Sequence, residues 1–140
     1  MTTVFRAASA IVAGMLLAFI LVVAVEVFSA VVHPVSPDFG GTMDEMCKHV
    51  ERYPHWVLAV VVPAWAGTAF ASTWIAGRLG NRGCALVVGL LLLTALIFNI
   101  SQLPYPSWFK VASLIVIPCA IVSGLYLSSR RNAAALNSTE

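Results

Sequence analysis

The chain has 140 residues, of which 60% are hydrophobic and 10% are charged. Soluble domains average about 45–50% apolar and about 25% charged residues, so this composition excludes a water-soluble globular protein. The net charge is +2, from 8 Lys and Arg against 6 Asp and Glu, and no basic tract indicates a nucleic-acid partner. The composition is typical of a polytopic membrane protein.

Four apolar runs are long enough to cross the hydrocarbon core of a bilayer as helices, which takes about 20 residues each. They lie at residues 7–32, 55–77, 83–100 and 108–127. Apolar and polar residues do not alternate in these runs, as they would in the strands of a membrane barrel. We therefore predict an all-α fold: a four-transmembrane-helix bundle that forms a single membrane domain over residues 1–140.

The first apolar run follows Arg6, as the core of a secretory signal peptide would. Signal-peptide cores are usually about 7–15 residues long, whereas this run is about 25, and no small-residue cleavage site ends it. We therefore expect a membrane span here and not a cleaved leader.

The distribution of basic residues predicts the orientation of the bundle. Five of the eight fall on one side of the predicted membrane: Arg6, Arg78, Arg82, Arg130 and Arg131. Because Lys and Arg are retained on the cytoplasmic side, both termini, including the tail at 128–140, are expected to be cytoplasmic. The loop at 33–54 is then extracytoplasmic, in a bacterial-type inner membrane.

A short surface helix is predicted within that outer loop, at residues 43–52. Thr42 and Glu45 have the spacing of a capping box, and Pro54 ends the helical pattern. Two pairs at (i, i+4) spacing support the helix, Asp44 with Lys48 and Glu45 with His49. Such a helix either packs as a lid over the bundle or presents a surface to a ligand or partner, and the pattern favours the lid.

Glu26 is the only acidic residue inside a predicted span. A carboxyl group in hydrocarbon is costly, so it is a candidate functional group. It lies about 9 Å from the centre of its span, towards the outer side. Residues predicted at a similar depth form a candidate intramembrane polar pocket: Glu26, Ser29, Asn99, Ser101 and Gln102.

Two roles for Glu26 are consistent with that depth. Its carboxyl group either takes up and releases protons, or it is a static hydrogen-bond partner for Asn99, Gln102 or a nearby hydroxyl. Hydrogen bonding is the commoner use of a polar side chain near the end of a span, so we favour the static role.

Two prolines, Pro63 and Pro118, lie inside the second and fourth spans. Each removes one backbone hydrogen bond and therefore predicts a helix kink. The carbonyl groups freed at Ala59 and Leu114 are able to line an ion path, but prolines in membrane helices more often serve packing.

Small side chains occupy one face of the second span, which allows another backbone to approach closely. This predicted helix-packing face consists of Ala64, Gly67, Thr68, Ala71 and Ser72. The neighbour is either another span of the same chain, which we favour, or a second copy.

No cofactor or metal site is predicted. Cys47, Cys84 and Cys119 form no C-x-x-C motif, which disfavours a thiol oxidoreductase. Cys47 and His49 are two residues apart on a predicted helix and therefore face different directions, so they do not form a pair of metal ligands.

The two predicted hairpins share their proline and tryptophan positions. Pro54 and Trp56 open the second span as Pro106 and Trp108 open the fourth. The repetition indicates either an internal duplication with parallel repeats or the common chemistry of membrane interfaces, and the sequence does not separate the two.

The segment Asn99-Ile-Ser-Gln-Leu-Pro-Tyr-Pro-Ser-Trp108-Phe, with Glu26 and Pro63-Ala-Trp65-Ala-Gly67, resembles a group of small bacterial four-helix inner-membrane proteins. No activity is assigned to that group. The resemblance covers most of the chain and implies the four-span topology, without indicating a substrate.

These features favour a non-enzymatic structural or interaction component of the inner membrane. The expected partners are the lipid bilayer and, for an interaction role, a second copy of the chain or another membrane protein. The alternative is a proton- or ion-coupled transporter of a small solute that uses Glu26. Small multidrug transporters share four spans and a first-span glutamate, but Glu26 lies nearer the outer end and the first loop is longer. An enzyme is disfavoured because no constellation of reactive side chains shares one depth.

Overall fold

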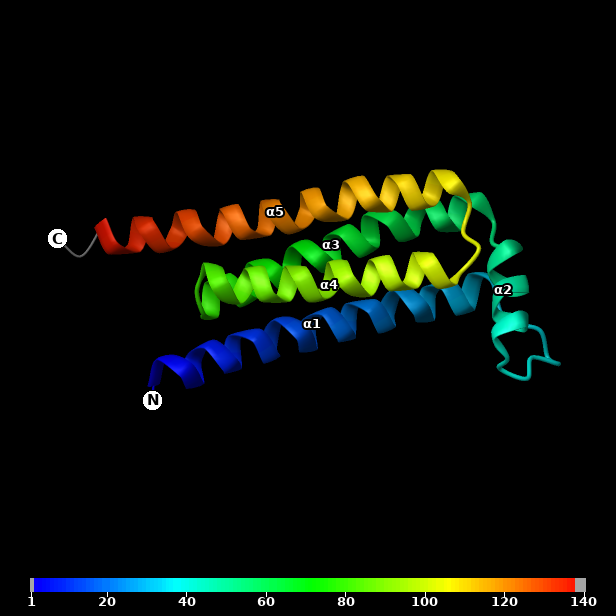
Figure 1. The fold of residues 1–140 in the computed structure, drawn as a ribbon, viewed down its shortest axis with the longest axis horizontal. Coiled ribbons are helices and arrows are strands. Elements are labelled where there is room, and N and C mark those ends of the chain that lie inside the picture. Colours follow the sequence, from blue (N-terminus) through cyan, green and yellow to red (C-terminus); the bar gives the residue numbers. More distant parts are fainter. Residues whose placement is uncertain (1, 138–140) are drawn as a thin grey trace.

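The described residues fold into five helices and contain no strand, which confirms the predicted all-α class (Figure 1). The helices are α1 (Thr2–Val32), α2 (Met43–Glu51), α3 (His55–Leu79), α4 (Arg82–Gln102) and α5 (Ser107–Asn137). The structure is a computed structural model that describes the backbone of residues 2–137 and the side chains of residues 3–129. Four helices are long and apolar enough to cross a membrane, as predicted.

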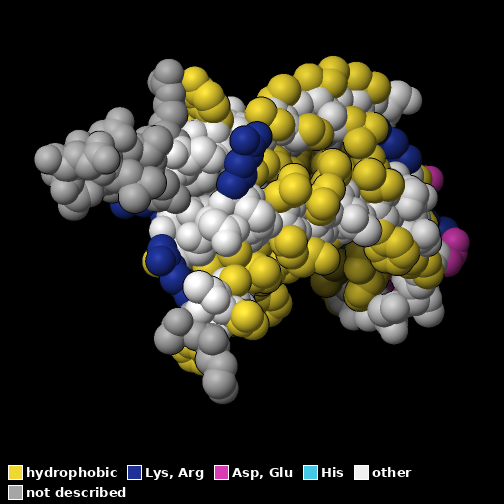
Figure 2. Space-filling model, turned by 60° about the vertical axis from the view of Figure 1, so that its left-hand side comes forward, with side chains coloured by type: hydrophobic (Ala, Val, Ile, Leu, Met, Phe, Trp, Pro, Cys, Tyr) yellow, Lys and Arg dark blue, Asp and Glu magenta, His cyan; other side chains and the backbone are white. Residues whose placement is uncertain are grey.

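The four long helices run side by side in alternating directions, and α2 lies across one end of the bundle (Figure 1). We call this end the α2 end. The opposite end, which holds the start of α1, the end of α5 and the connection between α3 and α4, is called the terminal end. Hydrophobic side chains cover the middle of the face drawn in Figure 2, whereas acidic side chains appear only towards the α2 end. This distribution is expected of a protein whose middle section is surrounded by lipid.

The helices extend beyond the predicted spans. α1 begins at Thr2 and α5 continues to Asn137, through most of the tail predicted at 128–140, whose last three residues lie outside the described part of the chain. Hydropathy marks only the length of chain that hydrocarbon requires, whereas a helix continues through the interface until a cap or a proline ends it. A cap also marks the start of α4, where the Asn81 side chain accepts a hydrogen bond from Cys84 N at 3.1 Å.

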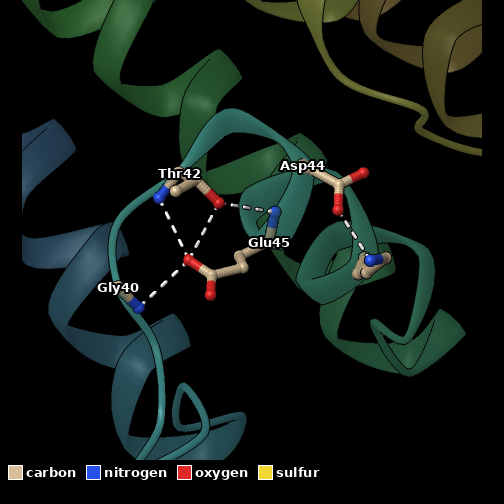
Figure 3. A network of polar contacts seen from close by, with 5 residues as sticks. Gly40, Thr42, Asp44 and Glu45 are labelled. Carbon is tan, nitrogen blue, oxygen red and sulfur yellow. Dashed lines mark hydrogen bonds and ion pairs between the residues drawn. The ribbon is translucent and has the colours of Figure 1, made fainter.

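The α2 helix is stabilised by the predicted capping box (Figure 3). Thr42 Oγ1 accepts a hydrogen bond from Glu45 N at 3.3 Å, and Glu45 Oε2 accepts one from Thr42 N at 3.1 Å. Glu45 Oε2 also accepts one from Gly40 N at 3.0 Å. These bonds, above all the one from the Thr42 backbone, lower the pKa of Glu45.

Of the two predicted charge pairs on α2, only one forms. Lys48 Nζ lies 2.6 Å from Asp44 Oδ2. The predicted pair of Glu45 with His49 is wrong, because the Glu45 carboxylate turns back to cap the helix and His49 stacks on His33. A cap satisfies two backbone N–H groups at once, whereas an exposed ion pair contributes little.

We predict that Thr42→Ala destabilises α2 by about 1 kcal/mol, because the helix loses its N-cap. Amide exchange across Met43–Glu51 should become faster, while the four long helices keep their protection. Thr42→Ser, which retains the hydroxyl, is the matched control and should exchange as the unmutated protein does. Equal protection of α2 in Thr42→Ala and Thr42→Ser would contradict the capping role.

The α3 helix is the centre of the bundle. It packs against α1, α4 and α5, and it has the largest buried share of the four spans although it is the least hydrophobic of them. Ser72, Thr73 and Ala76 on this helix are fully buried. Small and hydroxyl-bearing side chains suit an interior position in a membrane bundle because they permit close helix approach.

Glycines on the neighbouring helices make that close approach possible in the terminal half. A Cβ atom built on Gly124 of α5 would lie 2.8 Å from the Phe70 carbonyl oxygen, and one built on Gly14 of α1 would lie 3.0 Å from the Ser72 carbonyl oxygen. Both distances are to backbone atoms of α3, which cannot rotate away. The backbones of α1 and α5 therefore pack directly onto α3 in this half.

The predicted helix-packing face on α3 is divided by this arrangement. Thr68 and Ser72 are buried, Ala64 and Ala71 are half-buried, and Gly67 is exposed. A Cβ atom added at Gly67 would have no neighbour within 4 Å. The close intramolecular approach expected around Gly67 occurs instead around Ser72, one and a half turns further along α3.

Both α3 and α5 continue as helices through their internal prolines, Pro63 and Pro118. The kinks predicted at these positions stay a prediction. The two segments that carry the repeated proline and tryptophan lie side by side at the starts of α3 and α5. Trp108 Nε1 donates a hydrogen bond to Nδ1 of His55, the residue between Pro54 and Trp56, at 3.1 Å.

We predict that Gly124→Ala destabilises the bundle by about 1 to 3 kcal/mol, because the added methyl group overpacks the contact with α3. Gly67→Ala is the matched control on α3 and should leave the thermal unfolding temperature in detergent unchanged or raise it. An equal melting temperature for both variants would contradict the tight packing of the terminal half.

Candidate functional site

A cavity of about 180 Å³ lies between α1, α3, α4 and α5 in the half of the bundle nearer to α2. Its polar side chains are Glu26, Trp65, Thr68 and Asn99. The rest of its wall is apolar: Val22, Ala69, Leu92, Ala95, Leu96 and Ile117. We call it the Glu26 pocket.

The Glu26 pocket lies below the helix ends, within the predicted hydrocarbon region. Asn99 is three residues from the end of α4, Glu26 is six from the end of α1, and Trp65 is ten from the start of α3. At a rise of about 1.5 Å per residue these positions are about 5 to 15 Å from the α2 end. Ala69, fourteen residues from the start of α3, also lines the pocket, so the pocket reaches the middle of α3. The close approach of Gly124 to α3 begins there, at Phe70.

The mouth of the pocket lies between α1 and α4. Val22 and Glu26 on α1 and Ala95 on α4 are exposed, and each of these two helices packs more extensively against α3 than against the other. In a membrane this mouth faces lipid, so the Glu26 carboxyl group lies where the pocket meets the hydrocarbon.

Two residues that line the pocket each carry a polar atom that is buried without a hydrogen-bond partner, Trp65 Nε1 and Asn99 Oδ1. The first is a donor and the second an acceptor. Thr68 is different, because its hydroxyl donates to the Ala64 carbonyl oxygen at 2.9 Å. Buried polar atoms are nearly always hydrogen-bonded in folded proteins, so an unpartnered donor and an unpartnered acceptor in one cavity indicate a place for a polar group.

The structure brings together only part of the pocket predicted from the sequence. Glu26 and Asn99 line the same cavity, but no hydrogen bond joins them in the part of the chain that the structure describes, so Asn99, one of the three static partners considered for Glu26, does not pair with it. Ser29 is buried outside the cavity, and Ser101 and Gln102 are exposed. The Ser101 hydroxyl donates to the Phe98 carbonyl oxygen at 2.7 Å.

Trp65 and Thr68 complete the pocket, and the sequence analysis did not place them there. Both lie on α3 about three turns from its start. A comparison of residue depths in all four spans would have put Trp65 near the level of Val22, but not on the side of α3 that faces α1. The rotation of each helix decides this, and spans that are apolar all round carry little signal for it.

Two tyrosines lie near Glu26 on its α2 side. Burial raises the pKa of Tyr105, and the nearby Glu26 carboxylate and Tyr53 act in the same direction. Burial and Glu26 also raise the pKa of Tyr53, whereas a hydrogen bond with Ser29 acts against this. Both phenols therefore stay protonated, and neither adds a charge near the pocket.

Aromatic rings pack beside the pocket at the same level. The ring centroids of Trp65 and Phe109 are 5.6 Å apart, and those of Tyr105 and Phe109 are 4.7 Å apart. Phe109 is fully buried. Through Phe109, the Trp65 indole is therefore packed against the connection between α4 and α5, to which Tyr105 belongs.

Histidines join α2 to the end of α1. The rings of His33 and His49 stack with centroids 4.5 Å apart, and Tyr53 packs against both at 4.7 and 5.2 Å. Val50 of α2 is buried. This contact supports the predicted position of α2 over the bundle, and its three rings come from residues that the sequence analysis did not group.

The cysteines lie in separate parts of the molecule, and all three are free. Cys47 is on α2, Cys84 is buried near the terminal end and Cys119 is exposed on α5. Among the described residues, no group of three or more His, Cys, Asp or Glu side chains is placed to hold a metal ion.

Comparisons of the chain with protein-family models, curated proteins and solved structures find no match.

We predict that the contact of α2 with the bundle weakens as the pH falls below the ordinary pKa of histidine. Burial, and to a smaller extent His33, lowers the pKa of His49 from its ordinary value of 6.5. The undocked state therefore takes up a proton more readily, so docking is fully stable above about pH 6.5 and loses stability below it. Amide exchange of α2, corrected for intrinsic rates, should show more opening at pH 5.5 than at pH 7.5.

His49→Phe retains an aromatic ring that cannot ionise, so it should remove most of this pH dependence. His55→Gln is the control, because His55 contacts Trp108 and not α2. The same pH dependence in His49→Phe as in the unmutated protein would assign the effect to another group.

Proposed function

We propose that this protein is a non-enzymatic integral component of a membrane that acts by binding at the Glu26 pocket, without moving a solute across the bilayer. The observation that carries this proposal is the difference between the two halves of the bundle. A pocket with unpartnered polar atoms opens towards lipid in the α2 half, whereas backbone contacts at glycines close the terminal half.

The closed half supports binding over transport because glycines there bring whole helices into close contact with the backbone or the side chains of a facing helix. Gly89 of α4 faces Ile121 and Thr73, and Gly77 of α3 faces Ser128 and Ala85. Transport would require these backbones to separate in each cycle, with the loss of the close-range packing that stabilises helix association in a membrane.

The side chains around the pocket also support a role without catalysis. They offer one carboxyl, one amide, one indole and one hydroxyl group, and the described residues contain no hydrogen bond among them. Nucleophilic or acid-base catalysis usually depends on such a bond between a reactive group and the residue that activates it.

We further propose that the membrane is a bacterial-type inner membrane and that the terminal end is cytoplasmic. Arg6, Arg78 and Arg82 lie at this end, and Arg130 and Arg131 follow in the sequence. Such a bias is typical of cytoplasmic segments. Labelling of a cysteine introduced at Lys48 by a membrane-impermeant reagent in intact cells tests this orientation, and labelling only after lysis would reverse it.

The alternative function is a proton- or ion-coupled transporter of a small solute. The position of Glu26 at the mouth of the pocket favours it, because an intramembrane carboxyl group that lipid or a pocket can reach is typical of coupling sites. The two functions differ in whether Glu26 must ionise.

We predict that proteoliposomes of the unmutated protein show no proton flux above that of empty liposomes in a pH-dye assay. Glu26→Gln keeps the size and hydrogen-bonding capacity of the side chain but cannot ionise. If Glu26 serves only to bind a ligand, Glu26→Gln should change the free energy of unfolding in detergent by less than about 1 kcal/mol.

A solute-dependent proton flux in the unmutated protein that disappears in Glu26→Gln at unchanged stability would replace the proposed function by the transporter. Glu51→Gln, on the exposed face of α2, is the matched control for removing one carboxylate.

A further inference from the structure

We propose that the Glu26 pocket binds a small, neutral, hydroxyl-bearing apolar molecule that enters from the bilayer. This inference rests on the proposed function, since it specifies what the protein binds. It follows from the two unpartnered atoms, the volume of the cavity, the chemistry of its wall and the position of its mouth.

The two unpartnered atoms define the polar part of the ligand. Trp65 Nε1 has a proton to donate, and Asn99 Oδ1 has lone pairs to share. One hydroxyl group both accepts and donates hydrogen bonds, so a single group of this kind provides what both atoms lack. An ether oxygen or a ketone can serve only Trp65, and an ammonium group can serve only Asn99.

The wall of the cavity defines the rest of the ligand. Six of its ten residues are aliphatic. An ordered water molecule needs about 2 to 4 polar partners, so water is bound more stably near polar groups than near the aliphatic side chains of the wall. The volume of about 180 Å³ resembles that of cavities, about 150 Å³, that hold a benzene ring.

The mouth of the pocket defines the route of entry. Exposed Val22, Glu26 and Ala95 surround it, and they face the hydrocarbon between α1 and α4. A neutral molecule that partitions into the bilayer reaches this opening at low cost, whereas an ion must first be desolvated. Glu26 at the rim is able to accept or donate a further hydrogen bond as the hydroxyl group passes.

The test uses 4-ethylphenol as the probe, with the full-length protein in detergent micelles. The indole N–H resonance of Trp65, assigned by its absence in Trp65→Phe, should move downfield and saturate as 4-ethylphenol is added. Ethylbenzene lacks the hydroxyl group, and 4-ethylanisole can accept but not donate a hydrogen bond. Each should bind about tenfold more weakly, as expected for the loss of one buried hydrogen bond.

Protein variants test the two partners separately. Trp65→Phe and Asn99→Leu should each weaken 4-ethylphenol binding about tenfold, as followed by a ligand-observed saturation-transfer experiment. Trp56→Phe is the matched control, because Trp56 lies on the same helix, is exposed and does not line the pocket. It should leave the affinity unchanged.

Equal affinity for 4-ethylphenol and ethylbenzene would overturn the inference and define the pocket as a purely apolar cavity. Resonance shifts that rise without saturation, as for partition into the micelle, would also overturn it. Because the ligand series uses the unmutated protein, these outcomes do not depend on the folding of any variant. Failure of this test would leave the flux result untouched, so it can be distinguished from failure of the proposed function.

Discussion

The close approach of glycine-bearing helices to α3 is the interaction on which the rest of the molecule depends. In lipid there is no hydrophobic driving force between apolar helices, so association relies on close packing. Gly14 and Gly124 supply it by letting the backbones of α1 and α5 contact that of α3. The buried hydroxyl groups of Ser72 and Thr73 lie on the same central helix, where larger side chains would hold the neighbours apart.

The position of the Glu26 pocket is a consequence of the same packing. α1 and α5 are held on α3 near the terminal end, and towards α2 the facing residues are larger, among them Trp65 and Phe109. Bulky rings set helices further apart than glycines do and leave space beside them. The Glu26 pocket therefore lies where the packing changes from backbone contacts to aromatic contacts.

The spans and the capping box of α2 could be predicted because they depend on local sequence: a length of apolar residues, and Thr42 three residues before Glu45. The set of residues that lines the Glu26 pocket could not be predicted. It depends on how α3 and α4 are rotated, and a span that is apolar all round lacks the polar face that orients a helix in a soluble protein. Gly67 and Gly124 look alike in the sequence for this reason, although only Gly124 meets a neighbour. Glu26 and Asn99 were found because polar residues are rare enough in spans to be compared by depth.

The side chains and connections that can move lie mainly near the α2 end, which suits a pocket proposed to bind and release a ligand there. The contacts that close the terminal half are made by glycines against backbone atoms and side chains of the facing helices, with no room for a side chain between them, so they open only if whole helices separate. Beside the pocket, by contrast, the contacts are between side chains, and Tyr105 lies in a connection rather than in a helix. Side chains and connections move faster and at lower cost than packed helices. Exchange of the proposed ligand would therefore require motion only near the α2 end, while the tightly packed half stays intact.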